Sequence, residues 1–86
     1  MPEISRFFGI IISIFYDEHN PPHFHARYGE YKIVISVNTL QVLEGFFPPR
    51  ALGLVMEWAY LHKDELLKDW KLAEQNIQPE KIEPLK

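Results

Sequence analysis

Three of the four histidines of this 86-residue chain fall within residues 17–29, together with three carboxylate or guanidinium side chains. The stretch reads Asp-Glu-His-Asn-Pro-Pro-His-Phe-His-Ala-Arg-Tyr-Gly. His23 and His25 are two residues apart, so on a strand both side chains point to the same face. Two neighbouring imidazoles can chelate one metal ion, or they can divide the roles of general acid and general base.

A third ligand for such an ion would come from the residues just before the two prolines, where Asp17, Glu18 and His19 are the alternatives. A shell of histidine and carboxylate suits Zn²⁺, Ni²⁺ or non-haem Fe²⁺. The cofactor expected under this hypothesis is therefore a divalent metal. Its candidate ligands are His19, His23, His25 and Asp17.

The second chemical hypothesis is acid–base cleavage of a phosphodiester, as in a small ribonuclease toxin. Arg27 or Lys32 would stabilise the charge on the phosphoryl group. The candidate catalytic residues are His23, His25, Arg27 and His19. The chain carries nine cationic and twelve anionic side chains, a net charge of −3. Nucleic-acid binding is led by neutralisation of phosphates, so a nucleic-acid partner is conceivable but not favoured.

A structural interpretation stands beside both hypotheses. Asn20-Pro21-Pro22 is a stiff corner, since each proline restricts its own φ and the residue before it. His23 and His25 would then be half-exposed strand residues that hydrogen-bond to Ser36 or to the first strand. His62 falls on the apolar side of a predicted helix. It is expected to be a core histidine, on the opposite side of the sheet from the other two.

The elements around this stretch are predicted from hydrophobic periodicity. Residues 4–16 read as one long strand. Residues 24–28 and 31–37 form a hairpin, because Gly29-Glu30 is a two-residue loop of the kind that joins antiparallel strands. Paired residues share a face, so the register puts Phe24, Ala26, Tyr28, Tyr31, Ile33 and Ile35 on the core side. The same register puts His23, His25, Arg27, Lys32 and Ser36 on the other side.

Residues 41–46 are predicted to form the fourth strand, with its register left open. Pro48-Pro49 opens a helix over residues 50–75, whose apolar side chains recur every three or four residues. A break near residues 62–64 would shorten this long helix. The predicted fold is one α+β domain over residues 1–86. A four-stranded antiparallel sheet (β-β-β-β-α, residues 4–47) packs on one long C-terminal helix (48–75), and an extended tail (76–86) follows.

The open face of this sheet suggests a binding surface. It carries cationic side chains and His23 and His25, with Val34 and, from the first strand, Phe7, Ile11 and Phe15. Apolar groups beside a few cations suit a protein partner or a second copy of the chain. The chain has no cysteine, which fits a cytoplasmic protein. The N-terminal apolar run lacks a signal-peptide pattern and is too short to span a membrane, so no membrane association is expected.

The chain also resembles a family of small bacterial proteins defined by domain of unknown function 4160. The resemblance runs from residue 4 to residue 85. Its most specific parts are Pro-Pro-His-Phe-His (residues 21–25) and Glu-Trp-Ala to His (residues 57–62). Leu40 stands where the family's turn is expected to have glycine. The resemblance assigns no catalytic residues.

Members of that family are stand-alone domains, often encoded beside another small protein in an arrangement similar to toxin–antitoxin pairs. The resemblance therefore implies a protein-interaction component of a toxin–antitoxin-like two-gene module, with a small protein or a second copy as partner. The alternative is a histidine-dependent enzyme, either a metal-binding hydrolase or a ribonuclease-type toxin, centred on the Pro-Pro-His-Phe-His segment.

Overall fold

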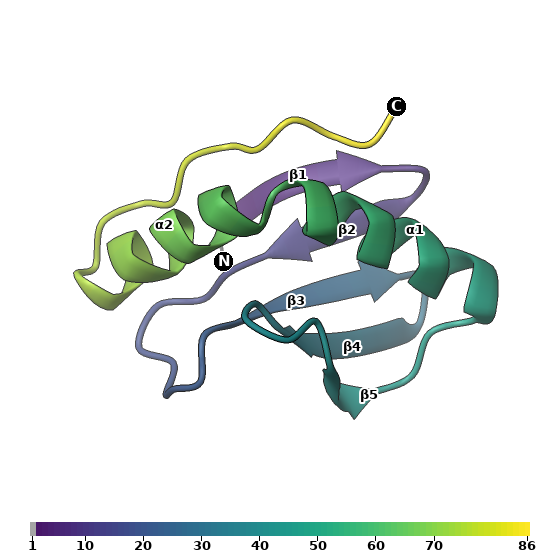
Figure 1. The fold of residues 1–86 in the computed structure, drawn as a ribbon, viewed down its shortest axis with the longest axis horizontal. Helices are drawn as coiled ribbons and strands as arrows, with labels where there is room; N and C mark the ends of the chain where they lie inside the picture. The colour runs from purple at the N-terminus through teal and green to yellow at the C-terminus, as the bar shows by residue number, and fades with distance from the viewer. Residues whose placement is uncertain (1) are drawn as a thin grey trace.

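Five antiparallel strands form one sheet in which each strand pairs with its neighbour in sequence, in the order β1-β2-β3-β4-β5. The computed structural model describes residues 2–86. Its elements are β1 (Glu3–Phe7), β2 (Ile10–Ser13), β3 (His23–Tyr28), β4 (Tyr31–Ser36), β5 (Val42–Gly45), α1 (Pro49–Leu61) and α2 (Lys63–Glu74). The two helices lie over one face of the sheet, and the C-terminal tail runs along β1 (Figure 1). The prediction of an α+β fold with an antiparallel sheet is confirmed.

The first apolar run is two strands, so the prediction of a single strand over residues 4–16 was wrong. Phe8 and Gly9 have φ values of 49° and 80°, and positive φ at both central residues is typical of a type I′ hairpin turn. Phe7 pairs with Ile10 on either side of this turn. Phe7 was expected on the open face but is buried, with its ring 5.5 Å from that of Trp58, because the turn and an irregularity in β1 change the alternation.

The hairpin of β3 and β4 has the predicted register. Ala26 pairs with Ile33, His25 with Val34, and Tyr28 with Tyr31. The side chains of Phe24, Ala26, Ile33 and Ile35 are buried, as expected. Tyr28 and Tyr31 were expected on the core side but are 38% and 36% exposed, because they flank the turn at the end of the sheet.

The connection from β4 to β5 contains Leu40 with φ of 61°. This is the left-handed region that favours glycine, so the expectation of a glycine-type turn at this position fits the backbone. In β5, Gly45 pairs with Ile33 and Glu44 pairs with Val34, with an irregularity before Val42 pairs with Ile35.

Two helices replace the single long helix that was predicted. α1 ends at Leu61, and His62 (φ −122°, ψ 27°) separates it from α2, within the window suggested for a break. A straight helix over residues 50–75 would reach roughly 39 Å at 1.5 Å per residue, whereas the longest dimension of the molecule is 33 Å. The break lets both helices cover the sheet.

The tail packs on the body through Ile82 and Leu85. Ile82 is buried, and its N–H donates to the carbonyl oxygen of Ile4 in β1 at 2.8 Å. The indole Nε1 of Trp58, which is fully buried between the sheet and the helices, donates to the carbonyl oxygen of Glu83 at 2.8 Å. The tail thus joins β1 to the helical layer.

Candidate functional site

Glu18, His23 and His25 bring three potential ligand atoms together, all within 4.8 Å of one another. Oε1 of Glu18 lies 2.8 Å from Nε2 of His25 and 3.3 Å from Nε2 of His23. All three residues are partly buried. One carboxylate oxygen therefore faces two imidazole nitrogens, and a metal ion or a shared proton could be held between them.

Secondary structure accounts for the two histidines. They are the first and third residues of β3 and lie on one face of it, with their ring centroids 5.3 Å apart. The corner before them is tied to the end of β4, because the carbonyl oxygen of Pro22 accepts the N–H of Val37 at 2.9 Å. The ring of Phe15 packs edge-on against His25, with a centroid distance of 4.3 Å. The contact with Phe15 limits how far the ring of His25 can rotate.

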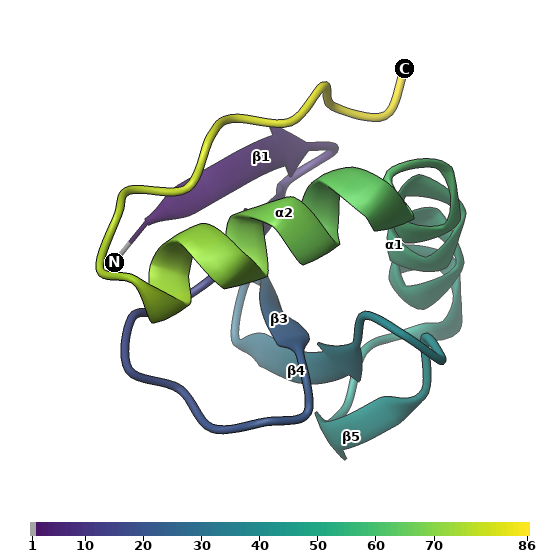
Figure 2. The ribbon, with the colours of Figure 1, turned by 60° about the vertical axis from the view of Figure 1, so that its left-hand side comes forward.

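A loop positions the carboxylate. Residues 14–22 connect β2 to β3 and pass below α2 (Figure 2). Asp17 has φ of 59°, a left-handed conformation that Asp tolerates better than most residues, and the chain turns there. Glu18, the next residue, reaches the two histidines while Asp17 and His19 remain exposed. Backbone conformation in the loop thus selects Glu18 among the three neighbouring candidates.

The hydrogen bond at the other ring nitrogen of His23 sets its tautomer. Nδ1 lies 2.8 Å from the carbonyl oxygen of Pro21. A carbonyl oxygen only accepts, so Nδ1 carries the proton and donates. In the neutral ring, Nε2 is then an unprotonated acceptor that faces another acceptor, Oε1 of Glu18. A favourable contact needs a cation between them, either a second proton on the ring or a metal ion. Metal-bound histidines commonly donate their other N–H to a carbonyl in this way.

The helical layer also contacts the site. The ring of Trp70 in α2 lies 4.9 Å from that of His23, and the side chain of His23 is only 12% exposed. The prediction placed His23 on the face away from the helices. α2 extends past the start of β3 (Figure 1), and Trp70 of this helix thereby contacts His23, the first residue of that strand.

Electrostatics keep Glu18 ionised. Partial burial alone would raise the pKa of this carboxyl group, but the hydrogen bonds and charges of His25 and His23 outweigh it and hold the pKa below its ordinary value of 4.5. Because the pKa of Glu18 is lower in the folded state than in the unfolded state, its ionisation stabilises the fold at pH values above 4.5. This contribution is lost as the pH falls below 4.5 and through the folded-state pKa. Near neutral pH, Glu18 is therefore a carboxylate that can serve as a ligand.

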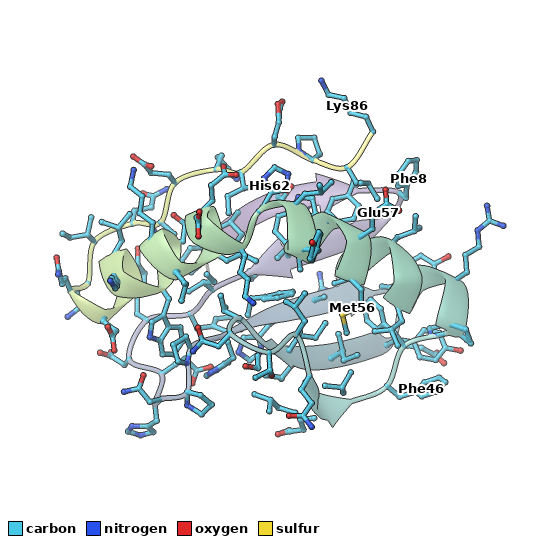
Figure 3. The ribbon with its side chains drawn as sticks, viewed as in Figure 1. Phe8, Phe46, Met56, Glu57, His62 and Lys86 are labelled. Carbon is cyan, nitrogen blue, oxygen red and sulfur yellow. The ribbon has the colours of Figure 1, made fainter. Side chains whose placement is uncertain are left out.

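The remaining predicted residues lie elsewhere. Asp17 and His19 are on the surface, outside the cluster of Glu18, His23 and His25. His62 sits at the junction of the two helices (Figure 3), where Nδ1 pairs with Oε1 of Glu65 and the ring packs on Trp58 at 5.5 Å. It is separate from the cluster. It was expected to be a core histidine but is only partly buried, because it lies at the break between the two helices.

A groove adjoins the cluster on the open face of the sheet. Its volume is about 370 Å³. His25 belongs both to the cluster and to the wall of the groove. Other side chains of the groove include Ile11, Phe15, Arg27, Lys32, Val34 and Glu44. Arg27, a predicted catalytic candidate, thus lies beside the cluster rather than in it.

None of the helices in residues 2–86 is long and apolar enough to cross a membrane. No curated protein and no solved structure matches the chain. The model of the family described as domain of unknown function (DUF4160) matches residues 9–71. This range contains strands β2 to β5, the loop with Glu18, both site histidines and most of the helical layer. The chain therefore belongs to the DUF4160 family.

Proposed function

We propose that the protein binds one divalent transition-metal ion through Oε1 of Glu18 and Nε2 of His23 and His25. The observation that supports this most is the 2.8 Å contact between Nδ1 of His23 and the carbonyl oxygen of Pro21, because a neutral ring that donates there has an unprotonated Nε2 toward Glu18. An imidazole and carboxylate shell suits Zn²⁺, Co²⁺, Ni²⁺ and Fe²⁺, and two histidines with one carboxylate leave further coordination positions open.

Those open positions adjoin the groove, since His25 is common to both. A metal with open positions can polarise a bound group or lower the pKa of a bound water. The proposal therefore favours a metal-dependent histidine enzyme over metal-free acid–base chemistry. In the metal-free alternative, Glu18 would hold both imidazoles in one ion-paired cluster.

The test is metal binding by tag-free protein. Wild-type protein is expected to bind one Co²⁺ per chain, seen in the visible absorption spectrum, and Zn²⁺ is expected to displace it. His25→Ala should weaken binding at least about a hundredfold, because even loss of a residue that only orients a ligand costs roughly 10–100-fold. Quenching of tryptophan fluorescence by Co²⁺ would be a second readout of binding, because Trp70, one of the two tryptophans, contacts His23.

His19→Ala is the matched control, since His19 is an exposed histidine of the same stretch outside the cluster. It should leave Co²⁺ affinity unchanged. Far-UV circular dichroism checks that both variants are folded. Equal weakening by the two substitutions, or no binding by the wild type, would refute the proposed site.

We also propose that the protein is an interaction component, in line with the two-gene arrangement that its bacterial family resemblance implies. The observation in favour is the edge strand β5, where Val42 and Leu43 are 40% and 46% exposed and the adjoining Phe46 is 64% exposed. An uncovered edge with apolar side chains can pair with a strand of another chain. A cytoplasmic location would fit this role.

Leu43→Lys is expected to abolish co-purification with the product of the neighbouring gene, because charge on an edge strand opposes strand addition. Leu61→Lys is the control, since Leu61 is an exposed leucine on the helical layer, far from β5 in sequence. Retention of the partner by Leu43→Lys, or its loss from both variants, would contradict a role for β5. Multi-angle light scattering distinguishes a hetero-complex from a homodimer.

A further inference from the structure

The groove beside the proposed metal site contains two cations that have no anionic partner among residues 2–86. Arg27 in β3 and Lys32 in β4 are directly paired across the hairpin, and both line the groove. Both side chains are exposed, and neither takes part in the ion pairs found within residues 2–86. Like charges placed directly opposite on neighbouring strands destabilise a sheet, so an anion bound between them would relieve a repulsion built into the fold.

The single carboxylate of the groove does not fill this role. Glu44 pairs with Val34, two positions along the sheet from the Arg27–Lys32 pair. Its carboxylate forms no hydrogen bond or ion pair with either cation within the described chain. The cationic end of the groove is therefore distinct from its acidic side.

Strand geometry sets the distance from this cationic pair to the metal cluster. His25 and Arg27 lie two residues apart on the same face of β3, which corresponds to roughly 7 Å along the strand. The floor and walls between them are largely apolar, with contributions from Ile11 and Val34. A ligand that uses both ends must be several atoms long and apolar in the middle.

We infer that the groove binds an extended organic anion, with one donor atom on the metal and a phosphate or carboxylate group between Arg27 and Lys32. This inference rests on the proposed metal site and names the class of ligand that the site would take. The apolar body of the ligand lies over Ile11 and Val34. A small inorganic anion on the metal would leave both the cations and the apolar wall unused.

The test uses Co²⁺-loaded protein and rigid aromatic probes at constant ionic strength. Terephthalate and 1,4-phenylenediphosphonate carry an anionic group at each end of an apolar ring. Benzoate and phenylphosphonate carry one. Each doubly anionic probe is expected to shift the Co²⁺ spectrum at roughly tenfold lower concentration than its singly anionic counterpart, since about 1.4 kcal/mol from the second group corresponds to tenfold in affinity. The carboxylate and phosphonate arms show which anion the groove prefers.

Arg27→Ala/Lys32→Ala should remove this difference while leaving Co²⁺ affinity intact. Arg50→Ala/Lys71→Ala is the matched control, because it changes the net charge equally at exposed cations outside the groove, and it should keep the difference. Equal affinities for the two kinds of probe, or equal losses in the two double variants, would overturn the inference while the metal site stands. Failure of wild-type protein to bind Co²⁺ would overturn both.

Discussion

Replacing Gly45 by alanine is expected to destabilise the protein by about 2–5 kcal/mol, combining left-handed backbone strain with overpacking. The φ value of Gly45 is +89°, and a Cβ atom there would lie 2.2 Å from the carbonyl oxygen of Lys32. That oxygen is fixed, because it accepts the N–H of Phe46 at 3.0 Å. The strand cannot move aside without losing the pairing of β5 with β4. A domain of this size has a total stability of roughly 4–13 kcal/mol, so the variant should be partly unfolded.

Urea denaturation of three alanine variants would check this result. Gly29→Ala shares the positive φ, at +59°, but its Cβ would meet nothing within 4 Å, so a loss of only about 1 kcal/mol is expected. Gly53 lies inside α1 in open space, and alanine there should stabilise by up to about 1 kcal/mol. A Gly45→Ala loss no larger than that of Gly29→Ala would disprove the close contact with Lys32.

Asp69→Asn is expected to stabilise the protein above pH 7 by about 1–3 kcal/mol. Asp69 in α2 is 1% exposed. Its Oδ1 accepts the N–H of Glu80 in the tail at 3.0 Å, while Oδ2 is buried and has no partner within the described residues. Burial raises the pKa of this carboxyl group to about 6, and the nearby charge of Glu80 adds to the rise, although the Glu80 N–H and Lys68 oppose it.

The sign of the pH dependence follows from linkage. Between the ordinary value of 3.8 and the folded value of about 6, the folded state retains a proton that the unfolded state has lost. Stability therefore falls as the pH rises through this interval, and the full penalty is present at neutral pH. The amide of Asp69→Asn resembles the protonated acid and keeps the oxygen that accepts from Glu80, so this fall should be absent.

Thermal unfolding of wild type and variant from pH 4 to pH 8 measures the effect. Asp64→Asn is the control, because Asp64 is exposed on the same helix and its replacement should leave the slope unchanged. Glu18, whose pKa is lowered, contributes in the opposite direction and below about pH 4.5, outside most of this interval. A variant that keeps the wild-type slope between pH 4 and pH 6 would show that Asp69 is not the group responsible.

Local rules accounted for the central hairpin and failed at the first strand. The register of β3 and β4 followed from a two-residue loop that begins with glycine and from two alternating strands that agree with each other. Phe8 has no such signal, because phenylalanine rarely adopts positive φ, and its neighbours are apolar on both sides of the turn. An apolar run of this kind reads as one strand. The position of the break at His62 depends on the length of the sheet below the helices, and the spacing of apolar residues in the helices carries no information about that length.

The same limit applies to the site. His23 and His25 were predictable as a pair, because the period of a strand places them on one face. Glu18 was one of three alternatives, since a loop has no period and the turn at Asp17 is not encoded by a motif. The contact between Trp70 and His23 joins residues 47 positions apart in the sequence, so it depends on the tertiary fold.

The two edges of the sheet differ in a way that limits how copies of the protein can assemble. The tail lies along β1 and is bonded to it through Ile82, whereas β5 at the opposite edge is exposed. Unlimited edge-to-edge pairing of sheets requires two free edges on every molecule. A chain with one covered edge can add one strand of a partner or one second copy of itself, and no further copy can then pair. The C-terminal segment therefore covers one edge of the sheet and leaves β5 as the edge that is open to strand addition.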